Sequence, residues 1–297
     1  MSKRTDFPKK RRELGRALNA IDRELAGLLG LETKWREASA REGEERRLLA
    51  QRLKESVVPL YIHRGRVPEG IGSCVLVRLD SDLYAFTAAH VLRDAGDAQL
   101  FAPPEGKGGK LRPLPRYTEH LCSSGNRNDL DVAVLVLPAS ELGPFQQRVF
   151  LVGAEIDQDD RPDDQAGESF YFVVGYPASR TQIKVSGLHI DQRLFQFATH
   201  PVLDAAEYEH ERLPQADHLL LDFDHNEISA GGNRLTPPKL QGASGGGIFH
   251  ITKKTKQGPL VAIATQNRRH STLIVGTRIK HFLAMAHELK TRPGSAE

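Results

Sequence analysis

The chain has 297 residues, of which 39% are hydrophobic and 27% charged, and its formal net charge is +3. This balance favours a folded, soluble protein that is long enough for one large domain or two smaller ones. The longest apolar runs, VAVLVL and LVAIAT, are strand-sized and fall short of the roughly 20 residues that cross a bilayer. We therefore expect no membrane span.

Residues 1–55 form a predicted basic, helical segment. They hold 15 Lys/Arg against 10 Asp/Glu, and residues 13–54 contain no proline and many helix-forming side chains. Apolar residues recur at spacings of four and three over residues 14–28, but the seven-residue register breaks further along. We expect a helical segment or hairpin that packs on the main domain or on a protein partner, and not a long coiled coil.

The start of this segment bears on partners and compartment. The run KKRR at residues 9–12 could neutralise nucleic-acid phosphates. No aromatic residues are interleaved with it and no recognised module accompanies it, so we favour a solvated helix start and expect no nucleic-acid partner. Because no apolar stretch follows the basic start, we also expect no secretory signal and a cytoplasmic location.

After residue 56 the chain consists mainly of short β-branched or aromatic runs, bounded by Gly, Pro, Asn and Asp. These runs cover residues 57–63, 72–79, 83–92, 131–137, 168–177, 184–190, 218–224, 259–266 and 271–279. Helical patterns do not alternate with them, so the sequence predicts an all-β sandwich or barrel and not a βαβ sheet. Residues 279–290 predict a closing helix, and residues 103–116 and 154–168 predict surface loops, the second of which could link two barrels.

The sequence shows no pattern typical of a metal site, a cofactor site or a disulfide framework. The two cysteines, Cys74 and Cys122, form no CxxC or Cys/His pair at metal-ligand spacing. Four histidines gather loosely in the sequence without the spacing of a ligand set: His200, His210, His218 and His225. We expect free or buried thiols, structural histidines, no metal and no cofactor.

Ser244 stands among four glycines in the stretch LQGASGGGIF at residues 240–249. A phosphate-binding loop is disfavoured because no Lys follows at the required place and the glycines lead into the strand-like IFHIT. The GxSxG elbow of an α/β-hydrolase is disfavoured too, because that fold needs a following helix and a later aspartate, and no aspartate follows Gly245. A turn that presents a nucleophilic serine remains.

The order histidine, aspartate, serine fits that third possibility. His90 ends the strand-like run YAFTAAH, Asp131 opens the apolar strand DVAVLVL, and Ser244 comes last. Asp129 competes with Asp131 as the acid, but it follows Gly-Asn-Arg-Asn and is typical of a turn, so we favour Asp131. We expect the three side chains to converge.

The residue types suit acyl transfer. A serine hydroxyl is a weak nucleophile until a base removes its proton, and histidine can take that proton and return it to the leaving group. The aspartate fixes the tautomer and stabilises the imidazolium. The backbone N–H groups of Gly242 and Ser244 are the expected donors to the oxyanion, where losing one donor costs about 2.7–4 kcal/mol.

Three blocks together, TAAHVL around His90, DVAVL around Asp131 and GASGGG around Ser244, resemble the signature of the trypsin-like (chymotrypsin-fold) serine peptidases. The GYP turn at residues 175–177 resembles the bacterial, HtrA-like branch. The resemblance covers residues 57–284 and implies two six-stranded antiparallel β-barrels, residues 56–153 and 154–297, with the site between them. The first barrel would carry His90 and Asp131, and the second Ser244 and the C-terminal helix.

The chain departs from this family at three points. Ala243 stands where digestive members carry an acid that pairs with a freshly cut N-terminus, and no IVGG-like start is present, so that mode of activation is not expected. Gly247 replaces a frequent proline. No cysteine after His90 can close the disulfide that often brackets the histidine, which suits a reducing compartment.

By the same resemblance, residues 238–241, including Gln241, would form one wall of the pocket for the side chain that precedes the cut. The strand residues Ala264, Thr265 and Gln266 would pair with the substrate backbone. No acidic residue among them can bind Lys or Arg, so a trypsin-like preference is not expected. The sequence predicts a serine endopeptidase that acts on a protein or peptide substrate; the alternative is a non-catalytic protein-interaction module on a protease-like fold.

Overall fold

The structure is a computed structural model of the whole chain, which divides into two compact units, residues 1–49 and 50–297. It describes residues 53, 55–65, 67–104, 109–115, 118–121, 130–156, 169–178, 181–184, 189–192, 194–223, 229–230, 233–234, 242–252, 258–268 and 272–292. The predicted helical segment therefore lies outside the described residues, apart from its last few positions. Cys122, Asp129, His225 and Gln241 also lie outside them.

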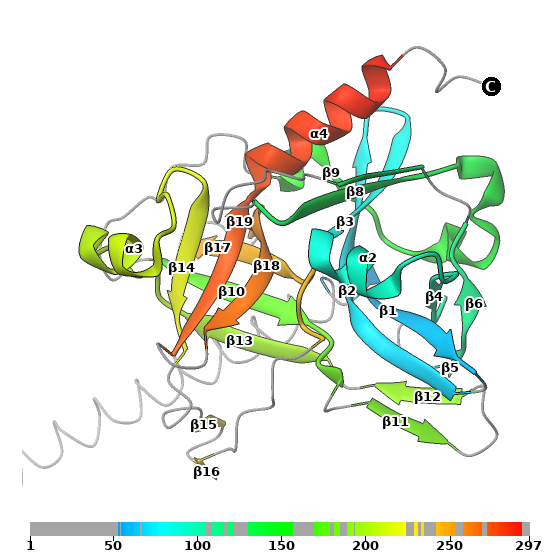
Figure 1. The fold of residues 1–297 in the computed structure, drawn as a ribbon, viewed down its shortest axis with the longest axis horizontal. Coiled ribbons are helices and arrows are strands. Elements are labelled where there is room, and N and C mark those ends of the chain that lie inside the picture. Colours follow the sequence, from blue (N-terminus) through cyan, green and yellow to red (C-terminus); the bar gives the residue numbers. More distant parts are fainter. Residues whose placement is uncertain are drawn as a thin grey trace, which may run out of the picture. The chain divides into compact units, whose positions relative to one another are not determined.

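The first half of the larger unit is an eight-stranded sheet with the order β6-β4-β1-β2-β3-β8-β7 and with β9 parallel to β2 (Figure 1). Its strands are β1 (Val57–Arg64), β2 (Val67–Leu79), β3 (Asp82–Ala88), β4 (Phe101–Ala102), β6 (Arg112–Pro113), β7 (Thr118–Leu121), β8 (Val132–Leu137) and β9 (Leu151–Val152). The long central strands are rich in Val, Leu and Tyr, which suit a pleated, buried surface.

The second half is a six-stranded antiparallel sheet with the order β13-β10-β17-β18-β19-β14. Its strands are β10 (Ser169–Gly175), β13 (Phe195–Thr199), β14 (His218–Asp222), β17 (Gly247–Thr252), β18 (Leu260–Arg268) and β19 (Leu273–Arg278). Just after β13, Pro201 forms a bridge with Leu221 of β14, and the N–H of Val202 donates to the carbonyl of Leu220 at 2.9 Å. The two outer strands thus meet, and the sheet closes on itself as a barrel.

Two smaller sheets accompany these bodies. In one, β11 (Thr181–Lys184) pairs with β12 (His189–Gln192), which pairs with β5 (Gly109–Lys110). In the other, β15 (Ser229–Ala230) pairs with β16 (Asn233–Arg234). Because β12 and β5 come from opposite halves of the sequence, the first of these sheets ties the two halves together.

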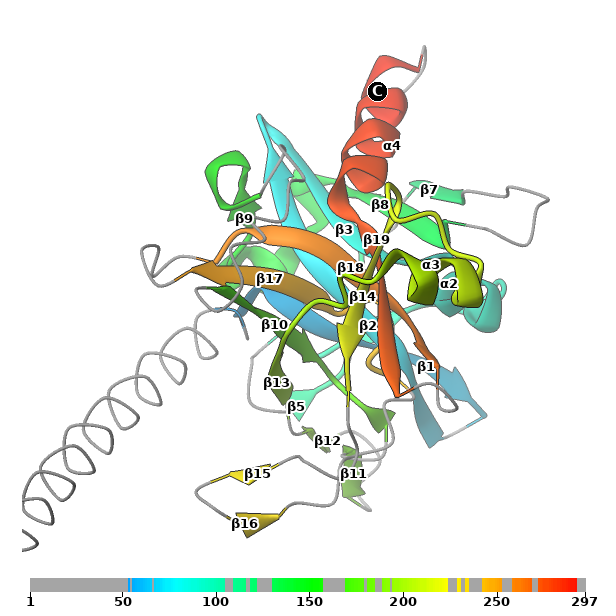
Figure 2. The same ribbon diagram turned by 90° about the vertical axis from the view of Figure 1, so that its left-hand side faces the viewer.

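Three α-helices are described: α2 (Ala89–Ala95), α3 (Ala205–Glu211) and α4 (Ile279–Thr291). Short 3-10 turns cover Ala139–Glu141, Gly143–Gln147 and Gly153–Glu155. In both ribbon views α4 lies beside β3 and β8 (Figure 1, Figure 2), and the buried ring of Phe282 lies 5.5 Å from that of Phe86. The C-terminal helix, although it follows the second sheet in sequence, packs on the first. No helix among the described residues is both long and apolar enough to span a bilayer.

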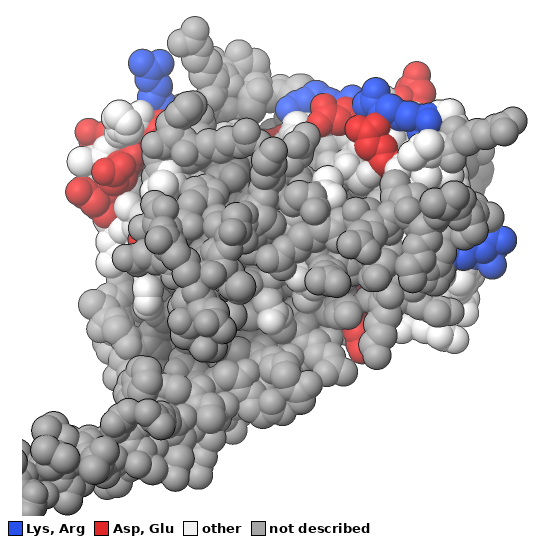
Figure 3. All heavy atoms as spheres, turned by 90° about the horizontal axis from the view of Figure 1, so that it is seen from below, with Lys and Arg blue, Asp and Glu red and all other residues white. Residues whose placement is uncertain are grey.

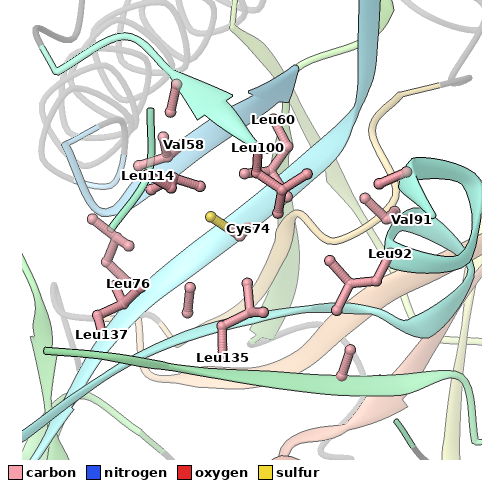
Figure 4. Packing of buried hydrophobic residues seen from close by; sticks show 14 of the residues in the cluster. Val58, Leu60, Cys74, Leu76, Val91, Leu92, Leu100, Leu114, Leu135 and Leu137 are labelled. Carbon is pink, nitrogen blue, oxygen red and sulfur yellow. The ribbon is translucent and has the colours of Figure 1, made fainter. Parts of the chain in front are cut away.

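Each large sheet has its own hydrophobic core. In the first, Cys74 lies among Leu60, Leu76 and Leu100, and Leu92 of α2 reaches into the same cluster (Figure 4). The core of the second is a separate set of buried residues from β10, β13, β14, β17, β18 and β19, which includes Phe195, Leu219, Phe223, Ile248 and Ile274. Two cores within one compact unit are what a double-barrel architecture requires.

The predicted all-β class, with two antiparallel sheet bodies and a C-terminal helix, is confirmed and is consistent with a chymotrypsin-like double barrel. The first sheet has eight strands instead of six because it includes short strands such as β4, β6 and β9. The closing helix, predicted for residues 279–290, spans Ile279–Thr291.

Three local predictions are wrong. The strand predicted for residues 83–92 ends at Ala88, where helix α2 begins, because the chain must turn there to bury Val91 and Leu92. The run at residues 184–190 is not one strand, because Lys184 ends β11 and His189 begins β12, which pairs antiparallel with β11. The loop predicted for residues 103–116 contains β5 and β6, and Leu111 and Leu114 within it are buried.

Candidate active site

His90 and Asp131 come from segments 41 residues apart and meet through two hydrogen bonds. The backbone N–H of His90 donates to Asp131 Oδ1 at 2.8 Å, and His90 Nδ1 lies 2.6 Å from Asp131 Oδ2. A carboxylate only accepts, so the proton of a neutral ring sits on Nδ1 and leaves Nε2 as an acceptor. The pair has the geometry of a base oriented by an acid.

The backbone of Asp131 explains how it reaches the start of α2. Its φ of +52° is in the left-handed region, which Asp tolerates better than most residues. Its carbonyl accepts the N–H of Ala89 at 3.0 Å while its carboxylate accepts the N–H of His90. Ala88, the residue at the N-cap, makes no side-chain cap, so Asp131 satisfies two of the first N–H groups of the helix from a distant segment.

The packing of α2 sets the direction of His90. Val91 and Leu92 are buried in the first core, whereas the side chain of His90 is 31% exposed. A Cβ added to Gly72 on β2 would lie 2.6 Å from Val91 Cγ1 and 3.1 Å from the carbonyl oxygen of Ser244. Gly72 is therefore in close contact both with the residue after His90 and with Ser244, so these two segments approach each other across β2.

The turn that carries Ser244 requires its glycines. Gly242 and Gly245 have φ values of +90° and +84°, which side chains rarely adopt. A Cβ on Gly245 would lie 1.9 Å from the carbonyl oxygen of Ser73 and 2.3 Å from Thr87 Oγ1, and one on Gly242 would lie 2.7 Å from the backbone nitrogen of Ala178. The turn thus packs directly against backbone of both halves of the molecule.

Ser73 of β2 is bonded to this turn. Its N–H donates to the carbonyl of Ser244 at 2.7 Å, and its hydroxyl donates to the carbonyl of Gly242 at 3.1 Å. The same hydroxyl accepts the N–H of Tyr176 at 3.0 Å, and Thr87 Oγ1 donates to the Ser73 carbonyl at 2.7 Å. Sequence reasoning missed Ser73; the available signal is a small polar residue within the otherwise apolar run of a buried strand.

The hydroxyl of Ser244 makes a different contact from the one expected of an activated nucleophile. It donates to the carbonyl of Thr265 on β18 at 3.3 Å. Among the described residues, no hydrogen bond joins Ser244 to His90. Rotation about χ1 of Ser244 would break this contact and move the hydroxyl to one of the two other staggered positions.

The amides of the turn fall into two groups. The N–H of Gly245 donates to the carbonyl of Ala264 at 2.7 Å, and that of Gly246 donates to the carbonyl of Ala243 at 2.9 Å. Within the described part of the chain, the N–H groups of Gly242 and Ser244 donate to no protein acceptor. These two are the N–H groups that the sequence analysis assigned to the oxyanion.

The predicted substrate-binding strand is present, but its side chains point inward. Ala264 and Thr265 are only 5% and 2% exposed, and Thr265 Oγ1 donates to the carbonyl of Val275 at 3.3 Å. Gln266 is exposed. The ladder from β17 to β18 covers Leu260 to Ile263 on β18, so the strand continues beyond it toward Arg268. The backbone of Ala264 is itself bonded to Gly245 and Gly246 of the turn, so the structure does not place Ala264 as a substrate-binding residue. Gln241 lies outside the described residues.

The ionisable side chains of Cys74, Arg148 and Tyr176, all in the larger unit, are buried. Burial raises the pKa of the Cys74 thiol to about 12 and that of the Tyr176 phenol to about 12, and it lowers the pKa of Arg148. Arg148 donates to the carbonyl of Pro103 at 2.7 Å. A thiol with such a pKa is protonated at neutral pH, so Cys74 does not supply a reactive thiolate.

Arg93, 52% exposed, places a guanidinium nitrogen 3.5 Å from Asp131 Oδ1, where solvent screens the interaction. Figure 3 shows one face of the molecule, on which described Lys and Arg stand beside Asp and Glu and do not gather into a broad basic patch. Among the described residues, no group of three His, Cys, Asp or Glu could hold a metal ion.

No family model matches the chain, and no curated protein sequence matches it. Among solved structures, the chain is similar to the scabies mite inactivated protease paralogue S-I1. The identity is 14%, the TM-score is 0.48, and the match covers 82% of this chain and 96% of that one. At this level the likeness carries no argument about the site, so the fold class rests on the two sheets described above.

Proposed function

We propose that this protein is a serine endopeptidase in which Ser244 is the nucleophile, His90 the general base and acid, and Asp131 the orienting acid. One observation carries the proposal: Asp131 holds the His90 ring through Oδ2 and its backbone N–H through Oδ1, and, among the described residues, the N–H groups of Gly242 and Ser244 in the glycine turn donate to no protein acceptor. Acyl transfer needs this combination of an oriented base and uncommitted donors.

The chemical steps follow from these atoms. His90 Nε2 takes the proton of the Ser244 hydroxyl as the oxygen attacks the substrate carbonyl, and the N–H groups of Gly242 and Ser244 receive the oxyanion. The imidazolium then protonates the leaving amine, which leaves an acyl-enzyme on Ser244. Water, deprotonated by His90, attacks the ester, and the imidazolium returns that proton to the Ser244 oxygen as the ester bond breaks and the acid leaves.

The substrate is a protein or peptide in an extended conformation. The N–H and carbonyl of Ala264 are bonded to Gly246 and Gly245 of the turn, so pairing of a substrate strand with β18 would begin at Thr265, past the end of the β17 ladder. The exposed side chain in this stretch, Gln266, is uncharged, which supports a preference for residues other than Lys and Arg.

The branch, the compartment and the partner remain proposals from the sequence. We propose that the protein belongs to the HtrA-like branch and is located in the cytoplasm. We also propose that a protein partner docks on the helical segment of residues 1–55. Among the described residues Cys74 is a free, buried thiol, which is compatible with a reducing compartment.

A non-catalytic protein-interaction module is the second candidate, and one contact favours it. The Ser244 hydroxyl donates to Thr265 and not to His90, so the nucleophile and its base are not joined. In an enzyme, this contact must break when substrate arrives, whereas in a binding module it persists.

Labelling with a fluorophosphonate probe separates the two candidates. We expect the wild-type protein to be labelled and Ser244→Ala not to be. Ser81→Ala, which removes an exposed hydroxyl on the β2–β3 turn, is the control and should be labelled like the wild type. Mapping the cleavage of a peptide library by the wild type then defines the specificity. Absence of labelling in the wild type, also with candidate partners present, favours the interaction module.

A further inference from the structure

We infer that Ser73, on the β2 strand of the first half, is a positioning residue for the oxyanion-binding amides of the second half. The inference rests on the proposed function and deepens it. Gly242 and Ser244, the two residues whose N–H groups are assigned to the oxyanion, both have their carbonyl groups bonded to Ser73. One bond comes from the Ser73 hydroxyl and the other from its backbone N–H.

The position of Ser73 in its sheet frees these groups. The ladder between β2 and β3 starts at the pair Val75–Phe86, so Ser73 lies two residues beyond its end. On the other side Ser73 is paired with Pro59 of β1, which has no N–H to donate. The N–H and carbonyl of Ser73 are therefore available to Ser244 and Thr87 at 2.7 Å each.

The hydroxyl of Ser73 does two things at once. It donates to the carbonyl of Gly242 at 3.1 Å and accepts the N–H of Tyr176 at 3.0 Å, in a side chain with no exposed surface. A hydroxyl can donate one bond and accept others, which alanine cannot do. Replacing it leaves a buried carbonyl and a buried N–H unpaired, and the peptide after Gly242 loses the bond that fixes its plane.

The neighbouring glycine makes the fit tight. The hypothetical Cβ of Gly245 falls 1.9 Å from the carbonyl oxygen of Ser73, so the turn has no room to move toward β2. The bonds from Ser73 hold it from moving away. Together they restrict the residues that carry the two donor amides, and a displacement of about 1 Å at such a site can lower the rate about 100-fold.

The test compares Ser73→Ala with Ser56→Ala. Ser56 is also fully buried and also donates one hydroxyl hydrogen bond, to the carbonyl of Leu53 at 2.9 Å, and none of the contacts described for the turn involves it. We expect Ser73→Ala to lower kcat about 10- to 100-fold with little change in KM. It should weaken the binding of a peptide boronate inhibitor, which mimics the tetrahedral state, by a similar factor. Ser56→Ala should leave kcat and boronate binding within twofold of the wild type.

A readout that does not depend on activity accompanies the kinetics. Hydrogen exchange of amides in residues 242–246 should be faster in Ser73→Ala than in the wild type, and unchanged in Ser56→Ala. If Ser73→Ala does not fold, Ser73→Cys keeps the size of the side chain with a weaker donor and should show the same losses to a smaller degree.

The outcomes distinguish this inference from the proposed function. A wild type that cleaves peptides, together with a Ser73→Ala variant of unchanged kcat and unchanged exchange, overturns the role of Ser73 and leaves the peptidase standing. A wild type without activity overturns the peptidase, and faster exchange in Ser73→Ala would still support Ser73 as the residue that orders the turn. Slower kcat with unchanged exchange in residues 242–246 contradicts positioning.

Discussion

His90 and Asp131 share two hydrogen bonds, one from the backbone N–H and one from the ring, and each uses a different carboxylate oxygen. The carboxylate therefore fixes both the start of α2 and the rotation of the imidazole that α2 carries. Asp131 is itself only 6% exposed in its side chain, so water competes little for these oxygens. Local helix structure and the orientation of the base depend on the same residue.

Asp131→Asn should lower kcat by about 10,000-fold, the size of the loss that follows when the triad histidine is held in the wrong tautomer. An amide can accept from the backbone N–H of His90, but its NH₂ then faces Nδ1 and donates to it, which places the ring proton on the wrong nitrogen. Steady-state kinetics and a thermal melt of the same preparation check this. A variant that keeps more than a tenth of the wild-type kcat would contradict the assignment of Asp131.

Gly245→Ala should destabilise the fold by more than about 3 kcal/mol, because a left-handed φ and a clash with backbone act together. The added Cβ meets the Ser73 carbonyl at 1.9 Å, and this backbone group lies within a strand and cannot retreat. Gly153→Ala is the matched control, since its Cβ would meet nothing within 4 Å. Denaturant unfolding measures both; equal effects at the two positions would show that the turn is not packed as described.

Phe282→Ala should cost about 3–5 kcal/mol of unfolding free energy, the usual range for a buried phenylalanine. Its ring has no exposed surface and packs on Phe86, so the change leaves a cavity between α4 and the first sheet. Lys280→Ala, on the partly exposed side of the same helix, should cost far less. If both variants melt at the wild-type temperature, α4 is not an integral part of the core.

Stability should fall at alkaline pH because two buried acids resist ionisation. Burial raises the pKa of Cys74 from 9.0 to about 12 and that of Tyr176 from 10.0 to about 12. Below pH 9 both are neutral in the folded and unfolded states, so they contribute no pH dependence. Above pH 9 for Cys74 and pH 10 for Tyr176 the group ionises first in the unfolded chain, and each lowers the unfolding free energy by roughly 1.4 kcal/mol per pH unit until its folded pKa is reached.

Urea unfolding between pH 8 and 11, in the wild type and in Cys74→Ala, measures this effect. The variant should show a shallower loss of stability with pH, because one of the two groups is gone. In the same preparations, iodoacetamide at pH 8 should modify Cys74 only after unfolding, as shown by peptide mapping. Rapid modification of the native thiol would mean that Cys74 is not buried.

Much of the fold could be predicted because buried strands leave short, continuous apolar runs in the sequence. Runs such as those at residues 57–63 and 131–137 become β1 and β8, whose side chains are buried on both faces. The strand end at Ala88 could not be predicted, because the residues that follow are apolar in either conformation. Helix α2 is set by contacts far away in sequence, with Asp131 at its start and the core around Leu92 along its side.

Only part of the candidate site could be predicted from the sequence. His90 and Asp131 could be singled out because rare residue types stand at the ends of apolar runs. Ser73 could not, since serine is common in strands and turns and its importance comes from lying past the end of one ladder and opposite Pro59 of another. The contact of the Ser244 hydroxyl with Thr265 depends on a side-chain rotamer, and no residue pattern encodes that.

The most direct measurement is the rate at which a fluorophosphonate modifies Ser244, followed by mass spectrometry of the peptide, in the wild type and in His90→Ala. If the imidazole withdraws the serine proton, adduct accumulates on residue 244 of the wild type and the variant is slower by about 1,000-fold or more. An equal rate in the two proteins, or an adduct on any other serine, would show that no base acts on this hydroxyl.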